Sequence, residues 1–315
     1  MHLPKLLLPL ALLLATAPFA QAAGEKIAVI PKGTTHSHWK SVEAGAREAA
    51  KELGAEIIWK GPLKEDDRAQ QIAVVQQFVT SGVDAIILAP LDDTALRSPV
   101  RAAADRKIPV VIFDSALKGE LGTDFVSYVA TNNRRGGELA GEELARLLNG
   151  KGKVVLLRYA EGSASTAERE SGFLDVIKKH SGIEVIVDNR YAGATASSAQ
   201  DVSMNLIDKI READGIFCAN ESSTQGMLLA LRQTGLVGKK TFVGFDASPY
   251  LLQALNKGDI HALVAQNPKR MGYASVVTAV KHLRGEPIKT EIDTGCVLVT
   301  KANQNTPEIR TVLGK

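Results

Sequence analysis

The sequence predicts an α/β protein built from parallel sheets that are covered by helices on both faces. Three observations support this fold class: short runs rich in valine and isoleucine, amphipathic helical patterns between them, and a strand–helix–strand unit that occurs twice. Continuous apolar strands that alternate with helices are typical of buried parallel sheets. The composition, 45% hydrophobic and 23% charged, is that of an ordinary globular protein.

Nine strands are expected in order along the chain. The apolar runs that predict them are KIAVIP (26–31), AEIIWKG (55–61), DAIILAP (84–90), IPVVIFD (108–114), FVSYVA (125–130), KVVLLRYA (153–160), IEVIVDNRY (183–191), DGIFCAN (214–220) and KTFVGFD (240–246). Helical periodicity fills the intervals, for example over residues 66–82 and 136–150, where Gly150 is the expected C-cap.

The repeated unit predicts two lobes. DAIILAP, a helix and KIPVVIFDS (84–115) recur as DGIFCAN, a helix and KKTFVGFDA (214–247), so Asp114 and Asp246 end equivalent strands. Ligands collect at the carboxyl ends of parallel strands, and two such lobes facing each other would direct both aspartates into one crevice. An aspartate after a strand is as readily a helix N-cap or turn residue. The equivalent placement of the two aspartates in the two lobes favours a ligand-binding site.

Residues 1–22 read as a cleaved secretory signal peptide, with His2 and Lys5 before a Leu/Ala-rich core and a small-residue cleavage pattern at its end. The alternative is a membrane anchor, but the apolar core is short for a span and is interrupted by prolines. We therefore expect a mature protein that starts near Ala23 and resides in the periplasm. The remaining residues are enough for two domains, each with its own hydrophobic core.

Charge and cysteine content limit the classes of partner. The net charge is only +3, with basic residues spread along the chain, so no nucleic-acid partner is expected. Cys218 and Cys296 each lie in an apolar run, where buried free thiols are expected and a disulfide is the alternative. Their spacing does not make a zinc site.

Five motifs together resemble the periplasmic binding proteins of the ribose-binding type, the solute receptors of ABC sugar importers. They are GFDASP, FDSALKGE, TNNRRGGELAG, STAERESGF and VAQNPKRMG. The resemblance covers nearly the whole mature chain. It implies the type I fold, with two Rossmann-like lobes joined by three hinge strands that cross near residues 130, 266 and 291.

That fold divides the chain into an N-terminal lobe, residues 23–130 plus 267–290, and a C-terminal lobe, residues 131–266 plus 291–315. The resemblance also implies that a ligand is clamped between them. Asp114, Asn220, Asp246 and Gln266 match family positions that contact the sugar. Their chemistry suits a polyol, because carboxylates accept from hydroxyl groups and amides both donate and accept.

The segment before the first helix departs from the family pattern. Where the family places an asparagine and two aromatic residues, this chain has His36, His38 and Trp39. The resemblance implies that Trp39 stacks on the apolar face of the sugar ring while the histidines line the cleft. The alternatives are that Trp39 packs the start of the helix and that His38 is a solvated turn residue.

Two further departures concern the second lobe. The arginine that many ribose-type receptors use aligns with Ala167, so Arg169 is expected either in the site or pairing within its own lobe. An aromatic residue of the family aligns near Ala194, which leaves Tyr191 as a substitute. A receptor that lacks both should bind something other than ribose.

Lys32 suggests a particular branch of the family. The stretches IPK, KGP and FDS resemble receptors for autoinducer-2 or rhamnose, and in the autoinducer-2 receptors a lysine and an aspartate at the positions of Lys32 and Asp114 touch the ligand. Those receptors have a further Asp-Gln pair and a Pro-x-Ala stretch. At the corresponding places this chain has Ala167-Glu168 and Ala219-Asn220-Glu221. Autoinducer-2 is therefore the less favoured ligand, although Lys32 at a strand end is expected in the cleft.

Other classes of protein lack their signatures. No GxSxG, HExxH, Walker or GxGxxG motif predicts an enzyme. A metal site at His36, His38 and Asp114 has only a weak signal, and a LacI-type regulator would begin with a helix-turn-helix. We expect a monomeric receptor without a cofactor that captures a monosaccharide or related polyol by hinge closure and delivers it to an importer permease. A receptor that feeds a membrane sensor instead stays open.

Overall fold

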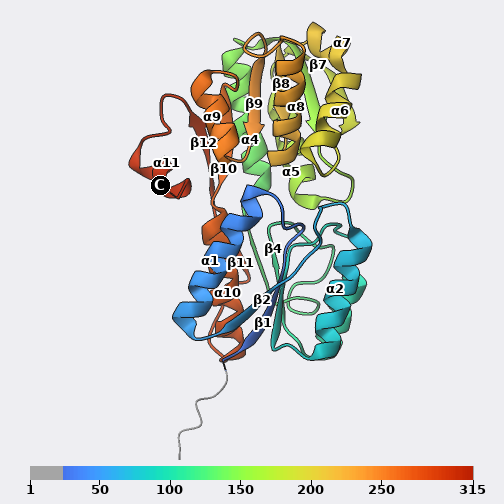
Figure 1. Cartoon of the computed structure of the whole chain (residues 1–315), viewed down its shortest axis with the longest axis vertical. Helices are drawn as coiled ribbons and strands as arrows, with labels where there is room; N and C mark the ends of the chain where they lie inside the picture. Colours follow the sequence, from blue (N-terminus) through green and yellow to red (C-terminus); the bar gives the residue numbers. More distant parts are fainter. Residues whose placement is uncertain (1–23, 315) are drawn as a thin grey trace, which may run out of the picture.

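The computed structural model describes residues 24–314, so the predicted signal peptide, residues 1–22, lies outside the described residues. Two lobes follow each other along the long axis of the molecule (Figure 1). Each lobe has one six-stranded sheet with helices on both faces. This confirms the predicted α/β class with two parallel-dominated sheets.

The first lobe has an entirely parallel sheet. Its strands, in spatial order, are β11 (Glu291–Asp293), β5 (Ser127–Ala130), β4 (Val110–Phe113), β3 (Ala85–Leu88), β1 (Lys26–Ile30) and β2 (Glu56–Trp59). Its helices are α1 (Ser37–Leu53), α2 (Arg68–Ser81), α3 (Arg97–Asp105) and α10 (Pro268–Leu283).

The second lobe repeats this winding, with one antiparallel edge strand. Its strands, in spatial order, are β12 (Cys296–Thr300), β10 (Ala262–Gln266), β9 (Thr241–Phe245), β8 (Gly215–Cys218), β6 (Lys151–Arg158) and β7 (Gly182–Tyr191), of which β12 runs antiparallel to β10. Its helices are α4 (Asn133–Leu147), α5 (Ala164–Ile177), α6 (Ala196–Asn205), α7 (Ile207–Glu212), α8 (Glu221–Gln233), α9 (Pro249–Lys257) and α11 (Pro307–Val312).

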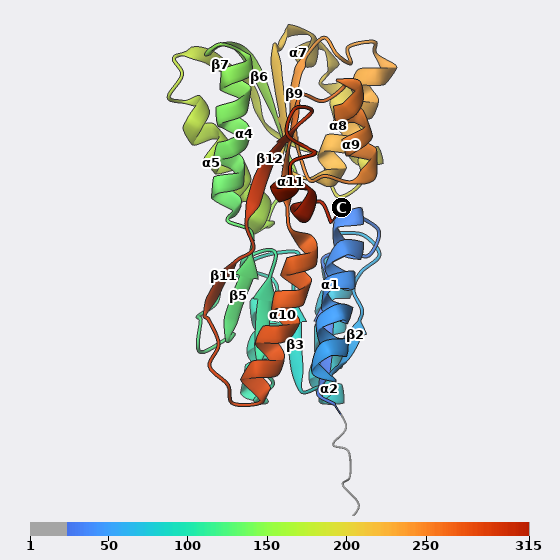
Figure 2. The same cartoon turned by 90° about the vertical axis from the view of Figure 1, so that its left-hand side faces the viewer.

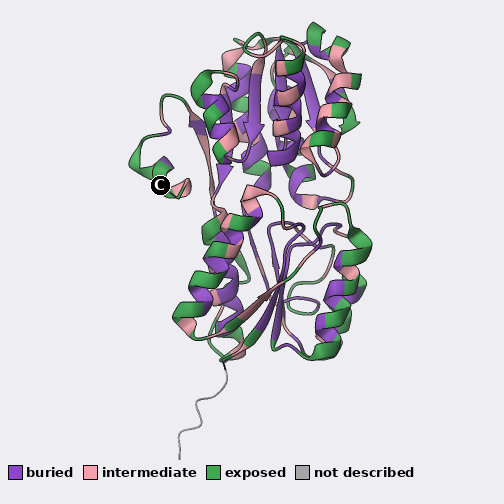
Figure 3. Ribbon diagram, in the orientation of Figure 1, coloured by how far each residue is buried: buried purple, intermediate pink, exposed green. Residues whose placement is uncertain are grey.

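Burial on both faces explains why the strands read as continuous apolar runs. Along β1, Ile27 and Val29 pack with α1 and α10, while Ala28 and Ile30 pack with α2 and α3 on the opposite face. Successive side chains of a strand point to opposite faces, so a sheet covered twice needs apolar residues at every position. Figure 3 shows the central strands of both lobes buried beneath partly exposed helices.

All nine predicted apolar runs form strands, β1 to β9, whereas one predicted helix end differs. Helix α4 ends at Leu147 rather than continuing to Gly150. Gly150 has a φ of 71° and closes the following turn by donating its backbone N–H to Ala145. The glycine therefore has the expected left-handed conformation, but it lies beyond the last helical residue.

Three segments connect the lobes (Figure 2): one between β5 and α4, one between β10 and α10, and one between β11 and β12. The third crossing differs from the predicted boundary at residue 291. Strand β11 pairs in parallel with β5, so residues 291–293 belong to the first sheet. The chain then enters the second sheet at Cys296, which pairs with Gln266.

Both cysteines are free thiols, so the disulfide alternative does not apply to this structure. Cys218 is fully buried in the core of the second lobe, as its apolar surroundings predicted, while Cys296 is partly exposed. Within residues 24–314, no helix is long and apolar enough to cross a membrane.

Candidate functional site

A small cavity of about 30 Å³ lies between the lobes, where the carboxyl ends of both sheets meet. One water molecule needs roughly 10–15 Å³ on this scale. The cavity is therefore narrow, and entry of a larger solute requires the lobes or side chains to move. Its lining residues come from both lobes and are Lys32, His36, His38, Trp39, Glu65, Asp114, Tyr159, Ser165, Thr166, Arg169, Asn220, Glu221, Asp246 and Gln266.

The structure thus brings together all nine residues that the sequence placed in the cleft. It adds five that sequence reasoning missed: Glu65, Tyr159, Ser165, Thr166 and Glu221. Glu221 directly follows the predicted Asn220 at a strand end, and Ser165 and Thr166 stand in a quoted motif. Glu65 has no comparable signal, because it lies in a loop among other charged residues.

Asp114 and Asp246 follow equivalent strands of the two lobes and share one uncommon backbone conformation. Their φ angles are 61° and 69°, in the left-handed region that residues other than glycine rarely adopt. Each donates its backbone N–H to the neighbouring strand, to Val129 and Val264 respectively. Such strained residues cluster at functional sites. The repeat seen in the sequence is therefore reproduced in local geometry.

The imidazole of His38 lies between these two aspartates. Its Nε2 is 3.0 Å from Asp114 Oδ1, and its Nδ1 is 3.9 Å from Asp246 Oδ1. Burial lowers the pKa of His38, but the hydrogen bond to Asp114 and the charges of Asp114 and Asp246 raise it above the usual value overall. His38 is thus a buried bridge across the lobes and not a solvated turn residue.

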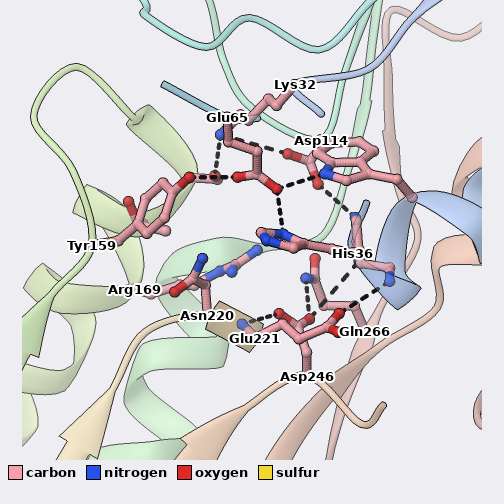
Figure 4. A pocket seen from close by; sticks show the side chains of 14 residues that line it. Lys32, His36, Glu65, Asp114, Tyr159, Arg169, Asn220, Glu221, Asp246 and Gln266 are labelled. Atoms are coloured by element: carbon pink, nitrogen blue, oxygen red, sulfur yellow. Dashed lines mark hydrogen bonds and ion pairs between the residues drawn. The ribbon is translucent and has the colours of Figure 1, made fainter. Parts of the chain in front are cut away.

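Glu65 accepts hydrogen bonds from three directions. The Trp39 indole Nε1–H donates over 2.6 Å, His36 Nδ1 lies at 2.7 Å, and the Tyr159 hydroxyl of the second lobe donates over 2.6 Å. Burial raises the pKa of the Glu65 carboxyl, but His36, Lys32 and the Tyr159 hydrogen bond lower it well below the usual range overall. The carboxylate therefore remains charged inside the cleft (Figure 4).

Trp39 lines the cavity but is almost entirely buried from solvent, with 2% of its surface exposed. It packs edge-to-face against His38 and Phe113, and its N–H is bound to Glu65. These contacts match the alternative in which Trp39 packs the start of the helix. A stacking role towards a sugar stays a prediction.

Lys32 reaches from the end of β1 to the second lobe. Its Nζ donates to the hydroxyls of Ser163 and Ser165 over 3.1 Å each and lies 3.7 Å from Asp114 Oδ2. Burial lowers the pKa of Lys32, while the charges of Asp114 and Glu65 oppose that shift. Lys32 is a cleft residue, as its position at a strand end predicted.

Arg169 is held within its own lobe. Its Nε donates to Asn133 Oδ1 over 2.8 Å, one terminal nitrogen donates to the Ala219 carbonyl over 3.0 Å, and the guanidinium lies 4.0 Å from the Phe245 ring centre. A Cβ on Gly137 of α4 would overlap the Arg169 carbonyl oxygen, so a glycine there allows α5 to approach closely. Arg169 thus lines the cavity with two of its five N–H donors engaged within its own lobe.

The remaining second-lobe residues are fixed by hydrogen bonds. Asn220 caps α8 through the backbone N–H of Ser223, and Asp246 accepts from the Glu221 backbone N–H at 2.8 Å and from Gln266 Nε2 at 2.7 Å. The Thr131 hydroxyl donates to Gln266 Oε1 over 2.8 Å. These polar groups are therefore held in place before any ligand arrives.

Glu221 contacts the first lobe at the start of α1. Its carboxylate oxygens accept the backbone N–H groups of Ser37 and His38 over 3.2 and 3.1 Å. The N-cap residue of α1, His36, makes no side-chain cap hydrogen bond. The second lobe thus satisfies helix N–H groups that α1 leaves open. Burial and the neighbouring Asp246 raise the pKa of Glu221.

The aromatic residue at the cleft from the second lobe is Tyr159, not Tyr191. Tyr159 is 1% exposed and lines the cavity at the end of β6, whereas Tyr191 is 41% exposed. Among residues 24–314, no group of three or more His, Cys, Asp or Glu side chains is placed to hold a metal ion.

Comparisons with known proteins agree with this geometry. A family model described as "Periplasmic binding protein domain" matches residues 27–287. The ribose import binding protein of Escherichia coli is 28% identical over 288 residues, which are 91% of this chain and 94% of that protein.

Two solved structures are similar over most of both chains. A periplasmic component of an ABC-type sugar transport system from Hahella chejuensis is 37% identical with a TM-score of 0.84, covering 87% of this chain and 99% of that one. A carbohydrate transporter solute binding protein from Agrobacterium radiobacter, in complex with D-arabinose, is 34% identical with a TM-score of 0.88, covering 92% and 99%.

Proposed function

Because this chain belongs to the periplasmic binding protein family, whose members are receptors and not enzymes, we propose that it captures a monosaccharide or related polyol between its lobes and delivers it to the permease of an ABC importer. The single observation that supports this most is the pair Asp114 and Asp246, which face one cavity from opposite lobes. A ligand that bonds to both can do so only when the lobes are closed, so binding shifts the population towards closure.

The charge balance of the cavity favours a neutral ligand. Its lining holds four carboxylates, from Glu65, Asp114, Glu221 and Asp246, opposite four basic side chains, from Lys32, His36, His38 and Arg169. A charged solute would add an uncompensated buried charge, which is costly. A polyol adds only hydroxyl groups, which donate to carboxylates and accept from basic groups.

The same balance bears on the role of Lys32, the residue that suggested the autoinducer-2 and rhamnose branch. Lys32 already donates to Ser163 and Ser165 and lies near Asp114, so it is not held in reserve for an anionic solute. We therefore place Lys32, with His36, His38, Asp114, Asn220, Asp246 and Gln266, among the groups that surround a neutral sugar. Export through cleavage of residues 1–22 and action as a monomer in the periplasm belong to the same proposal.

A thermal-shift screen of the protein without residues 1–22 tests the function. The probes are D-ribose, D-arabinose, D-fucose, D-allose, myo-inositol and autoinducer-2, each with wild type and with Asp246→Ala. We expect one neutral carbohydrate to raise the melting temperature of wild type and not of the variant, because a ligand that binds only the folded state stabilises it by mass action. Stabilisation by none of the neutral carbohydrates, or stabilisation that persists in Asp246→Ala, would contradict the proposal.

A further inference from the structure

Glu65 is a buried charged residue of the cleft for which neither the sequence nor the family resemblance gives a role. It lies in the loop between β2 and α2, and its side chain is 8% exposed. Its Oε1 accepts a hydrogen bond from Trp39 Nε1–H and pairs with His36 Nδ1, while its Oε2 accepts a hydrogen bond from the Tyr159 hydroxyl. A carboxylate with three partners at 2.6–2.7 Å is fixed in position and in charge.

His36 is the group that Glu65 orients. With Nδ1 bound to Glu65, the opposite ring nitrogen, Nε2, has no hydrogen bond among residues 24–314. Figure 4 shows the ring in the middle of the cleft, between Glu65 of the first lobe and Glu221 and Asp246 of the second. The side chain reaches this position because His36 is the N-cap residue of α1 and its side chain is not used for capping.

The surroundings of His36 favour the charged ring. Burial lowers the pKa of His36, but the charge and hydrogen bond of Glu65 and the charges of Glu221 and Asp246 raise it to about 9 overall. Asp114, His38, Lys32 and Arg169 are the other charged groups of the cavity, and Lys32 is itself close to Glu65. An imidazolium donates from both nitrogens and accepts from neither.

We propose that Glu65 is a positioning residue that holds His36 as a fixed cationic donor, and that His36 thereby selects solutes that present an acceptor oxygen at the centre of the cleft. The selection step rests on the function proposed above. A hydroxyl or ether oxygen accepts from Nε2–H, whereas an ammonium group offers no acceptor and carries the same charge. The site accordingly takes neutral sugars and rejects their amino-substituted counterparts.

The positioning of His36 by Glu65 can be tested without any ligand. Proton NMR follows the His36 ring signals from pH 5 to 10 in wild type and in Glu65→Gln. The glutamine keeps the size of the side chain but removes its charge. We expect the His36 midpoint near pH 9 in wild type to fall by at least one pH unit in Glu65→Gln.

Tyr159→Phe is the matched control, because it removes a hydrogen bond to Glu65 but leaves the carboxylate charge in place. Its His36 midpoint should stay close to that of wild type. A wild-type midpoint near 6.5, or equal midpoints in wild type and Glu65→Gln, would overturn the proposal.

Selection is tested by calorimetric titration with matched pairs: D-glucose against D-glucosamine and D-galactose against D-galactosamine. At pH 7, wild type should bind each neutral sugar at least tenfold more tightly than its amine. This ratio should fall at least threefold in His36→Gln, which serves as a second variant if Glu65→Gln does not fold. An amine that binds wild type as tightly as its parent sugar would overturn the selection.

The two proposals fail in different ways. If neutral sugars bind but the His36 titration is unchanged in Glu65→Gln, the sugar receptor stands and the positioning role falls. If the His36 midpoint shifts as expected but neither these sugars nor those of the thermal-shift screen bind, the positioning role stands. In that case the proposed function falls, and the selection step falls with it.

Discussion

The two lobes have the same winding, yet they present different chemistry to the cleft. The first lobe contributes ionic pairs that depend on protonation: His38 with Asp114, and His36 with Glu65. The second lobe contributes groups that are tied to its own backbone, such as Asn220, which caps α8. The comparison teaches that the same fold can serve a site in two ways. One lobe supplies cleft groups held mainly by ionisable side chains, and the other supplies cleft groups held mainly by its own backbone.

The largest contrast is expected between the two equivalent aspartates. Asp114→Asn leaves the buried Lys32 and His38 without their shared anionic partner, which should cost about 3–5 kcal/mol of unfolding free energy. Asp246→Asn faces mainly the neutral donors of Gln266 and Glu221 and should cost about 1–3 kcal/mol. Urea unfolding at pH 7 measures both. Equal losses would remove the distinction between the lobes.

Alkaline pH should destabilise the folded protein by weakening the pair of His36 and Glu65 in the first lobe. The pKa of His36 is raised to about 9, so its stabilisation is complete below the unfolded value near 6.5 and is lost as the pH rises through 9. The shift corresponds to roughly 3 kcal/mol. Unfolding free energies of wild type measured from pH 6 to 10 should show this fall. The fall should be absent in His36→Gln, and a persistent fall would assign it to another group.

Glu221→Gln should act between the lobes rather than within one. The variant removes a negative charge from the N-terminus of α1, an interaction typically worth about 0.3–1 kcal/mol. We expect the affinity for the sugar found by thermal shift to fall about two- to fivefold, as measured by calorimetric titration. An unchanged affinity would show that this contact does not contribute to closure.

A further contrast is expected between two tyrosines of the second lobe. Tyr159→Phe removes one hydrogen bond to Glu65 across the lobes, worth about 0.5–1.5 kcal/mol, and should weaken sugar binding about two- to tenfold. Tyr191→Phe alters an exposed residue outside the cavity and should leave affinity unchanged. A loss of sugar affinity in Tyr191→Phe would show that Tyr191 contributes to the site after all.

Much of the fold was predictable because strands buried on both faces leave an unambiguous signal. The run KIAVIP became β1, and the repeated strand–helix–strand unit identified Asp114 and Asp246 as equivalent before their shared backbone conformation was visible. The change of sheet after β11 was less predictable. A strand of only three residues at a lobe boundary carries little periodicity.

The site was predictable where it follows strand ends and not where it depends on loops. Asp114 and Asp246 directly follow strands, Lys32 lies two residues after β1, and the carboxyl-end rule selects all three. Glu65 is one of several charged residues in the loop before α2, and only tertiary packing distinguishes it from its neighbours. Likewise, no local pattern indicates that Tyr159 rather than Tyr191 faces the cleft.

A crystal structure of the complex with the sugar identified by the thermal-shift screen tests the central claim most directly. The account predicts one sugar between the lobes, with hydroxyl groups within hydrogen-bond distance of both Asp114 and Asp246. A sugar bound to one lobe alone, or outside the cavity that these aspartates share, would contradict it.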